Sequence, residues 1–142
     1  MACMSQEKKA ELQPRIKACL AKHGFKGTVS VRNHSTLVLN ITAGRLDLIA
    51  DYNRTIRPAY EREWGTGSFN EETYIDVNPY HWRSAFSTPE ALAFFEELFP
   101  ILNHGNWDCS DTQTDYFDVG WYLDVNVGKW NRPYAFFQQE AA

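Results

Sequence analysis

The chain has 142 residues, a net charge of −4 and 44% hydrophobic residues, values that exclude an intrinsically disordered protein and suit one domain around a single core. No apolar run approaches the ~20 residues of a membrane-spanning helix, and residues 1–9 are too polar for a signal peptide. Three cysteines without a Cys-x-x-Cys pair suggest neither a disulfide framework nor a zinc site. We therefore expect a cytoplasmic, reduced single domain over 1–142 with no metal and no cofactor.

A first helix is predicted over 13–22, followed by a glycine that suits its C-terminal end. Pro14 is acceptable there because it falls in the first helical turn, where a missing N–H breaks no helical hydrogen bond. Before this helix, residues 1–12 are either flexible or form a weaker helical turn from Ser5. The apolar face of the helix consists of Ile16, Cys19 and Leu20.

A β-hairpin and a second helix are predicted next. Apolar and polar residues alternate in 28–32 and again in 36–42, which is the period of a strand. Apolar residues then recur at helical spacing from Arg45 onward. Pro58 disfavours continuation, so this helix is expected to end there and to be followed by a loop over 59–71.

The second half of the chain predicts a strand, a helix and a long strand. Residues 73–78 form a short strand. Residues 87–90 offer either a capping box or an N-cap at Thr88 with a proline at the first helical position, and the helix that follows extends to residue 102. The segment 117–127 alternates without interruption, and 133–137 suits a short edge strand. The predicted order is αββαβαβ, an α+β fold with a four- or five-stranded antiparallel sheet and three helices mainly on one face.

A nine-residue pattern occurs at 74–82 and again 48 residues later at 122–130, with Tyr, Asp, Val, Asn and Trp identical. Side chains of a strand alternate between its faces, so each copy buries an aliphatic pair and shows Tyr, Asp and Asn on the other face. If the copies are neighbours, these polar side chains form either an ordinary solvent-facing surface or a surface that binds a partner. Trp82 and Trp130 are expected to plug the core at the strand ends. The candidate binding face consists of Tyr74, Asp76, Asn78, Tyr122, Asp124 and Asn126.

An acidic loop is predicted at 104–118, which contains four aspartates and no lysine or arginine. Its spacing is not that of an EF-hand loop, so a divalent cation is not the expected ligand. Such residues commonly cap turns, and exposed carboxylates beside aromatic residues also suit contact with a basic protein. The residues of this candidate contact are Trp107, Asp108, Asp111, Asp115 and Asp118.

The sequence contains no motif of a serine hydrolase, zinc protease, P-loop enzyme or zinc deaminase. His104 and Cys109 lie close in the sequence, but a catalytic thiol also needs a base nearby in space and a lowered thiol pKa. We therefore expect a protein that is not an enzyme. The remaining histidines, His23, His34 and His81, are interpreted as isolated helix-end, turn and surface residues.

Charge is divided unevenly, since residues 1–71 carry +4 and residues 72–142 carry −8. The two halves either neutralise each other when they pack together or leave charged surfaces for partners. A nucleic-acid-binding protein that uses the basic first half is the alternative function, and its binding would weaken steeply with salt. A small enzyme of unknown class is the third.

The segment 26–32, Lys-Gly-Thr-Val-Ser-Val-Arg, followed by the alternating segment 35–44 and a helix, resembles a large polyvalent protein-associated domain of phages and plasmids. The resemblance ends near residue 60 and implies a mobile-element origin and a role in handling host defences or conjugal entry. It transfers no functional residue. The expected function is a small acidic protein-binding module, an inhibitor or accessory protein of a mobile element, with no membrane contact and with homodimer formation left open.

Overall fold

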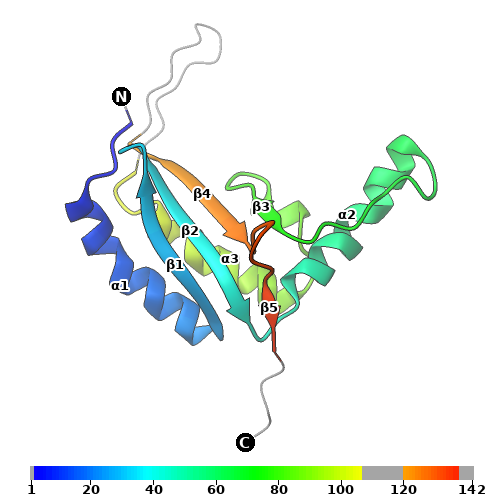
Figure 1. Cartoon of the computed structure of the whole chain (residues 1–142), viewed down its shortest axis with the longest axis horizontal. Coiled ribbons are helices and arrows are strands. Elements are labelled where there is room, and N and C mark those ends of the chain that lie inside the picture. The colour runs from blue at the N-terminus through cyan, green and yellow to red at the C-terminus, as the bar shows by residue number, and fades with distance from the viewer. Residues whose placement is uncertain (1, 107–119, 138–142) are drawn as a thin grey trace, which may run out of the picture.

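A computed structural model of the chain describes residues 2–106 and 120–137. Within these ranges the chain forms three helices, five strands and one 3₁₀ turn, and the helices α1 and α3 lie behind the sheet in Figure 1. The elements follow in the order α1 (Gln6–Lys22), β1 (Phe25–Arg32), β2 (Thr36–Gly44), α2 (Leu48–Trp64), β3 (Ile75–Val77), a 3₁₀ turn (Trp82–Ser84), α3 (Pro89–Leu102), β4 (Tyr122–Val127) and β5 (Ala135–Phe136).

The strands form one mixed sheet with the order β1-β2-β4-β3, and β5 pairs with the end of β2. The α+β class is confirmed, and the β1–β2 hairpin is antiparallel as predicted. β2 and β4, however, are parallel from Thr36↔Tyr122 to Ile41↔Val127, so the prediction of a wholly antiparallel sheet is wrong. The chain passes through α2, β3 and α3 between these two strands, which gives the long crossover that a parallel pair needs.

The two copies of the repeat lie side by side as β3 and β4. These strands are antiparallel, with Asp76 opposite Asn126 and Val77 opposite Val125. The aliphatic residues of the copies face the helices, and Val77 and Val125 are each 1% exposed. The two copies of the repeat therefore form two adjacent strands of the sheet. In both strands the aliphatic side chains face the core and the polar side chains face the other side, as predicted.

The first helix begins at Gln6, well before the predicted start, and the Ser5 hydroxyl accepts a hydrogen bond from the Lys8 N–H. Pro14 therefore lies inside α1 and not in its first turn. An interior proline costs a helical hydrogen bond, but the helix continues because its apolar face is buried on both sides of Pro14. The buried residues of this face are Leu12, Ile16, Cys19 and Leu20.

Helix α2 also continues through a proline, so the predicted helix end at Pro58 and the predicted loop start at 59 are wrong. Its last turns project away from the sheet (Figure 1), and Trp64 is 65% exposed. The segment that returns from this projection is fixed by Asn53. Its side-chain amide donates to the Glu72 carbonyl at 2.9 Å, and its oxygen accepts from the Glu72 N–H at 2.8 Å.

Helix α3 starts at Pro89 directly after Thr88, as predicted, although the Thr88 side chain makes no capping bond. The two residues before the helix are held instead by α2, where the buried Asp51 carboxylate accepts from the Ser87 N–H at 3.0 Å and the Thr88 N–H at 3.2 Å. The apolar face of α3 fills the core below the sheet with Ala91, Phe94, Phe95, Leu98, Phe99 and Leu102.

The two repeat tryptophans have different environments. Trp82 is 2% exposed and stacks on Phe99 at a centroid distance of 5.8 Å, so it belongs to the core as predicted. Trp130 is 80% exposed in the turn after β4, so its assignment to the core is wrong. Among the described residues, no helix has both the length and the apolar character needed to cross a membrane.

Candidate functional site

Polar side chains from four strands cover the face of the sheet that α1 and α3 leave open. One row crosses the whole sheet, because Thr28 pairs with Asn40, Asn40 with Asn126, and Asn126 with Asp76. The Asn126 side-chain amide donates to Asn40 Oδ1 at 3.1 Å. The structure thus brings the predicted residues Asp76 and Asn126 together and adds hairpin residues that sequence reasoning missed.

The two repeat aspartates on this face have unequal partners. Asp124 accepts from the Arg32 guanidinium at 2.6 Å and from the Asn126 amide at 3.2 Å. The Asp76 carboxylate, by contrast, has no hydrogen bond or ion pair with any residue in the described ranges. Burial raises the pKa of the Asp76 carboxyl, the nearby Asp124 carboxylate raises it further, and Arg32 opposes both effects. One guanidinium therefore does not balance the two carboxylates.

These charged groups line an open groove of about 450 Å³ that Thr36, Pro79 and Leu123 also border. Two repeat tyrosines are exposed beside these strands: Tyr122, 47% exposed, starts β4 and lines the groove, whereas Tyr74, 45% exposed, directly precedes β3 and lies outside the residues that line the groove. The Tyr122 ring gives the groove an apolar rim with a hydroxyl group that can donate a hydrogen bond.

Asn78, the last predicted residue of this face, has a local structural role. Its side-chain oxygen accepts from the Tyr80 N–H at 2.8 Å and from the His81 N–H at 3.2 Å, so it caps the turn that follows β3. Asn78 lines the groove, but its acceptor is already used. The residues of the face with free charge or exposed area are consequently Asp76, Tyr74 and Tyr122.

The acidic-loop residues predicted to contact a partner, Trp107, Asp108, Asp111, Asp115 and Asp118, lie outside the described residues, and so does Cys109. Their assignment stays a prediction. A second groove of about 550 Å³ lies between α2 and residues 71–73. Two of its charges are paired with each other, because the Arg57 guanidinium donates to Glu71 at 3.2 Å.

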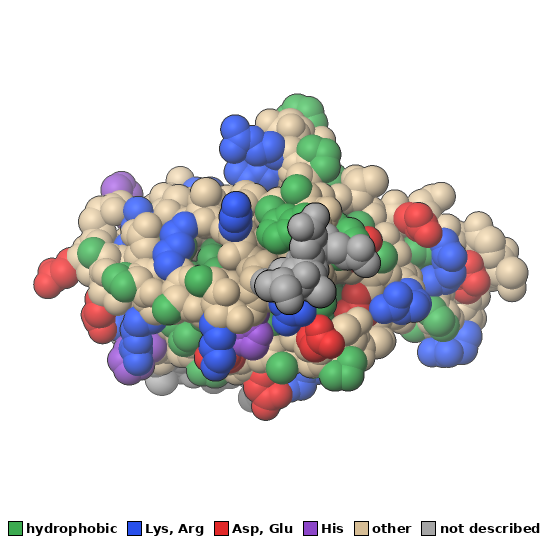
Figure 2. Space-filling view, turned by 90° about the horizontal axis from the view of Figure 1, so that it is seen from below, with side chains coloured by type: hydrophobic (Ala, Val, Ile, Leu, Met, Phe, Trp, Pro, Cys, Tyr) green, Lys and Arg blue, Asp and Glu red, His purple; other side chains and the backbone are tan. Residues whose placement is uncertain are grey.

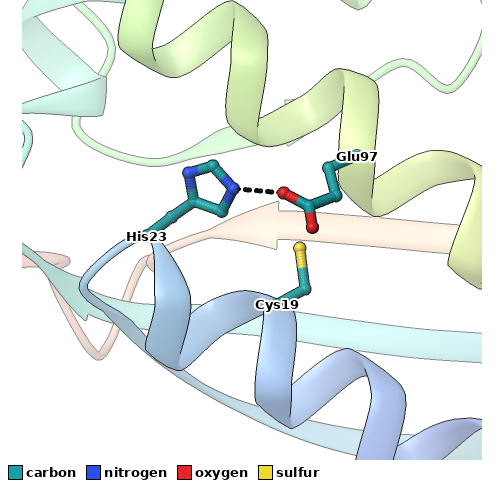
Figure 3. Close-up of side chains that lie close together, drawn as sticks. All are labelled: Cys19, His23 and Glu97. Carbon is teal, nitrogen blue, oxygen red and sulfur yellow. Dashed lines mark hydrogen bonds and ion pairs between the residues drawn. The ribbon is translucent and has the colours of Figure 1, made fainter.

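A different cluster, which the sequence did not predict, lies where the end of α1 meets α3 (Figure 3). His23 is at the end of its helix, as predicted, but it is not isolated, because its Nε2 lies 2.6 Å from Glu97 Oε2. The Lys22 ammonium donates to the other Glu97 oxygen at 3.0 Å. The hydrogen bonds from His23 and Lys22 hold the pKa of the Glu97 carboxyl below its usual value.

The buried Cys19 thiol completes this cluster, since its Sγ, a His23 ring nitrogen and a Glu97 oxygen lie within 4.8 Å of one another. Burial first, and then the nearby Glu97 carboxylate, raise the pKa of the Cys19 thiol to about 11. A protonated thiol is a poor nucleophile, so the arrangement does not resemble an activated catalytic cysteine. The sequence signal is the four-residue spacing of Cys19 and His23 on one helix face, but nothing in the sequence pairs them with Glu97.

The acidic second half of the chain engages part of the basic first half. Three ion pairs join the halves within the described residues: Lys22 with Glu97, Arg32 with Asp124, and Arg45 with Glu90. Figure 2 shows Lys and Arg side chains spread over one face of the molecule, with acidic and hydrophobic side chains between them. This distribution favours mutual neutralisation over a continuous track for a nucleic-acid backbone.

Comparison of the chain with protein-family models, with curated proteins and with solved structures found no match. The resemblance to a polyvalent protein domain therefore stays an expectation from the sequence. The open sheet face and the Cys19, His23 and Glu97 cluster are accordingly interpreted from their own geometry.

Proposed function

We propose that the chain is a non-enzymatic protein-binding module that holds a basic segment of a partner protein on the open face of its sheet. The observation that carries this proposal is the unpaired carboxylate of Asp76 beside Asp124, with a single guanidinium between two negative charges. A lysine or arginine side chain from the partner would supply the missing positive charge. A charge-assisted hydrogen bond in a partly buried groove is stronger than one in bulk water.

The side chains around the two aspartates support the same function. Tyr74 and Tyr122 are close to half exposed, and tyrosine is enriched at the centre of protein interfaces because its ring packs while its hydroxyl donates. The surface around Tyr122, Asp76 and Asp124 is an open groove and not a closed pocket, which suits an extended protein segment better than a small molecule.

Two further features of the sequence fit this function. The aspartates of the acidic loop, Asp111 and Asp115, would give this chain more negative charge with which to contact the same kind of basic partner. An inhibitor or accessory role in a mobile element, which the family resemblance implies, would use this surface to occupy a basic site of the partner.

A titration with a short peptide of alternating lysine and glycine tests the proposed surface. In ¹⁵N-resolved NMR spectra of the full chain, we expect shift changes centred on Asp76, Asp124 and Tyr122. Asp76→Asn should weaken peptide binding about tenfold, because it removes one charged partner of a hydrogen bond. A matched control is Glu90→Gln, which removes an exposed carboxylate that is paired with Arg45 elsewhere on the molecule.

A peptide of alternating glutamate and glycine should leave the spectrum unchanged. Shift changes that map away from the sheet face, or equal affinity for wild type and Asp76→Asn, would refute the proposed surface. If Asp111→Lys with Asp115→Lys weakens binding while Asp76→Asn does not, the loop and not the sheet face is the interface. A salt-sensitive complex with single-stranded DNA in filter binding would favour the nucleic-acid alternative instead.

A further inference from the structure

Three side chains with metal-binding atoms meet between α1 and α3. Cys19 and His23 are four residues apart, so they lie on one face of the last turns of α1, and Glu97 projects toward them from α3 (Figure 3). The Cys19 sulfur, a His23 ring nitrogen and a Glu97 carboxylate oxygen all lie within 4.8 Å of one another. The cluster is separate from the open sheet face, because α1 and α3 cover the opposite side of the sheet.

We propose that Cys19, His23 and Glu97 form a binding site for a zinc-like divalent cation. Sulfur, imidazole nitrogen and carboxylate oxygen are the three donor types that zinc takes in proteins. Bond lengths of about 2.0–2.3 Å to a tetrahedral ion place ligand atoms roughly 3.3–3.5 Å apart. The His23 nitrogen and the Glu97 oxygen, now 2.6 Å apart, therefore need to separate only slightly to admit the ion.

The charges of the site match a divalent cation. Coordination replaces the thiol proton of Cys19, which leaves to solvent, so the resulting thiolate and the Glu97 carboxylate together neutralise a doubly charged ion. Cys19 is 3% exposed, which shields the metal–sulfur bond, and Glu97 lies at the surface and gives the ion access. Within the described ranges no fourth cysteine, histidine or carboxylate joins the cluster, so a water molecule would complete a tetrahedral shell.

The His23 ligand is held in place by contacts outside the cluster. Its ring lies against Phe94 at a centroid distance of 5.4 Å, and its backbone carbonyl accepts from Arg45 Nε at 3.0 Å. Such supporting contacts reduce the reorganisation that metal binding requires.

Lys22 distinguishes a metal site from a merely structural ion pair. Its ammonium donates to Glu97 at 3.0 Å and is exposed, so it competes with a cation for the same carboxylate. If the cluster only holds α1 and α3 together, removing the Lys22 ammonium should slightly weaken the contact between the two helices. If the cluster is a metal site, the same change should make it bind the cation more tightly. We therefore expect Lys22→Ala to raise the affinity for Zn²⁺ severalfold.

Cobalt titration of the full reduced chain tests whether Cys19 is a ligand, because a thiolate bound to Co²⁺ gives a charge-transfer absorption band. The band should appear in wild type, in Cys3→Ser and in Cys109→Ser, and should be absent in Cys19→Ser. Absence of the band in wild type, or its persistence in Cys19→Ser, would overturn the proposal.

Calorimetric titration with Zn²⁺ tests the other two ligands. His23→Gln and Glu97→Gln should each lower the affinity at least tenfold, whereas the neighbouring exposed controls His104→Gln and Glu96→Gln should not. Zn²⁺ should also raise the melting temperature of wild type and of both controls, since it binds only the folded chain. Equal affinities in the ligand variants and the controls, with far-ultraviolet circular dichroism of each variant unchanged, would refute the site. Its failure would leave the peptide-binding proposal untouched, because the two surfaces share no residue.

Discussion

The two aspartates of the repeat occupy equivalent sequence positions but have different side-chain partners in the fold. Asp124 lies on the inner strand β4, where Arg32 reaches it from β1, across β2, and Asn126 lies two positions further along β4. Asp76 lies on the outer strand β3, which pairs only with β4 among the described strands. The unpaired carboxylate is thus a consequence of strand order, and it leaves the folded chain with an unfavourable interaction that a basic partner would relieve.

This interpretation predicts that Asp76→Asn stabilises the free protein at neutral pH. An acid whose pKa is raised in the folded state holds its proton more tightly there, so folding becomes less favourable as pH rises from the ordinary value of 3.8 to the raised pKa. The melting temperature of the variant should exceed that of wild type above this interval, and the difference should vanish below it. Calorimetry over a pH series measures the effect.

The matched comparison for that experiment is Asp124→Asn, which loses the bond to Arg32 and should not be stabilised at neutral pH. A melting temperature of Asp76→Asn at or below that of wild type at neutral pH would mean that the Asp76 carboxylate is already compensated in the folded protein.

Asp51 is a residue with a structural role, and its loss should be costly. Its buried carboxylate accepts from the Ser87 and Thr88 N–H groups, directly before α3, and also from the Thr55 hydroxyl at 3.2 Å. Asp51→Ala leaves these donors without an acceptor, so we expect the free energy of unfolding to fall by about 3 kcal/mol in urea denaturation. Asp47→Ala removes an exposed cap that only accepts from the Ala50 N–H, and it should cost about 1 kcal/mol. Equal losses would contradict the bridging role of Asp51.

At the scale of elements, the helices and strands were predictable where one face is buried, but the start of α1 and the end of α2 were not. Pro14 was expected in the first turn of α1 and Pro58 at the end of α2, but both helices continue through their proline. In α1 the buried residues on either side of Pro14 outweigh the lost hydrogen bond, and in α2 the Asn53 contact to residue 72 anchors the chain beyond the proline. Local propensity therefore placed the elements correctly, while tertiary packing decided their length.

The candidate site was predictable to the same extent. The period-two pattern of the repeat correctly predicted that Asp76 and Asn126 share a face, because strand geometry alone fixes that orientation. It could not supply Arg32 or Asn40, since these reach the face through the parallel pairing of β2 with β4, which lie far apart in sequence. The Cys19, His23 and Glu97 cluster was missed for the same reason, as it needs the packing of α1 on α3.

The large apolar side chains of α3 and of the end of α2 differ in burial, and this difference predicts different effects on stability. Phe95 in α3 is fully buried and contacts Phe86 and Phe94 at centroid distances of 4.8 and 5.0 Å. Phe95→Ala should lower the free energy of unfolding by about 3–5 kcal/mol, because it opens a cavity in the centre of the core. Trp64→Gln, in the projecting end of α2, should change it by less than about 0.5 kcal/mol. A large loss from Trp64→Gln in urea unfolding would show that the projection is packed in solution.

At the scale of the whole molecule, the charge asymmetry along the chain becomes a set of contacts between its halves. Lys22, Arg32 and Arg45 each pair with a carboxylate from the second half. These pairs are at least partly exposed, so each contributes little to stability by itself. Each pair neutralises one basic side chain of the first half, whereas the Asp76 carboxylate on the open sheet face has no ion-pair partner among the described residues.

The position of β4 in the sheet predicts that the first 106 residues do not fold alone. β4 is central, between β2 and β3, and its Val125 and Val127 are 1% and 0% exposed. Without it, β2 has an unpaired edge, β3 has no partner strand, and the core residues of α3 lose part of their cover. A chain of residues 1–106 should give a poorly dispersed amide NMR spectrum and no cooperative thermal transition, whereas the full chain should give both dispersed signals and a sharp transition. Well-dispersed signals from the fragment would mean that α1, the β1–β2 hairpin and α3 form a stable core before β4 joins the sheet.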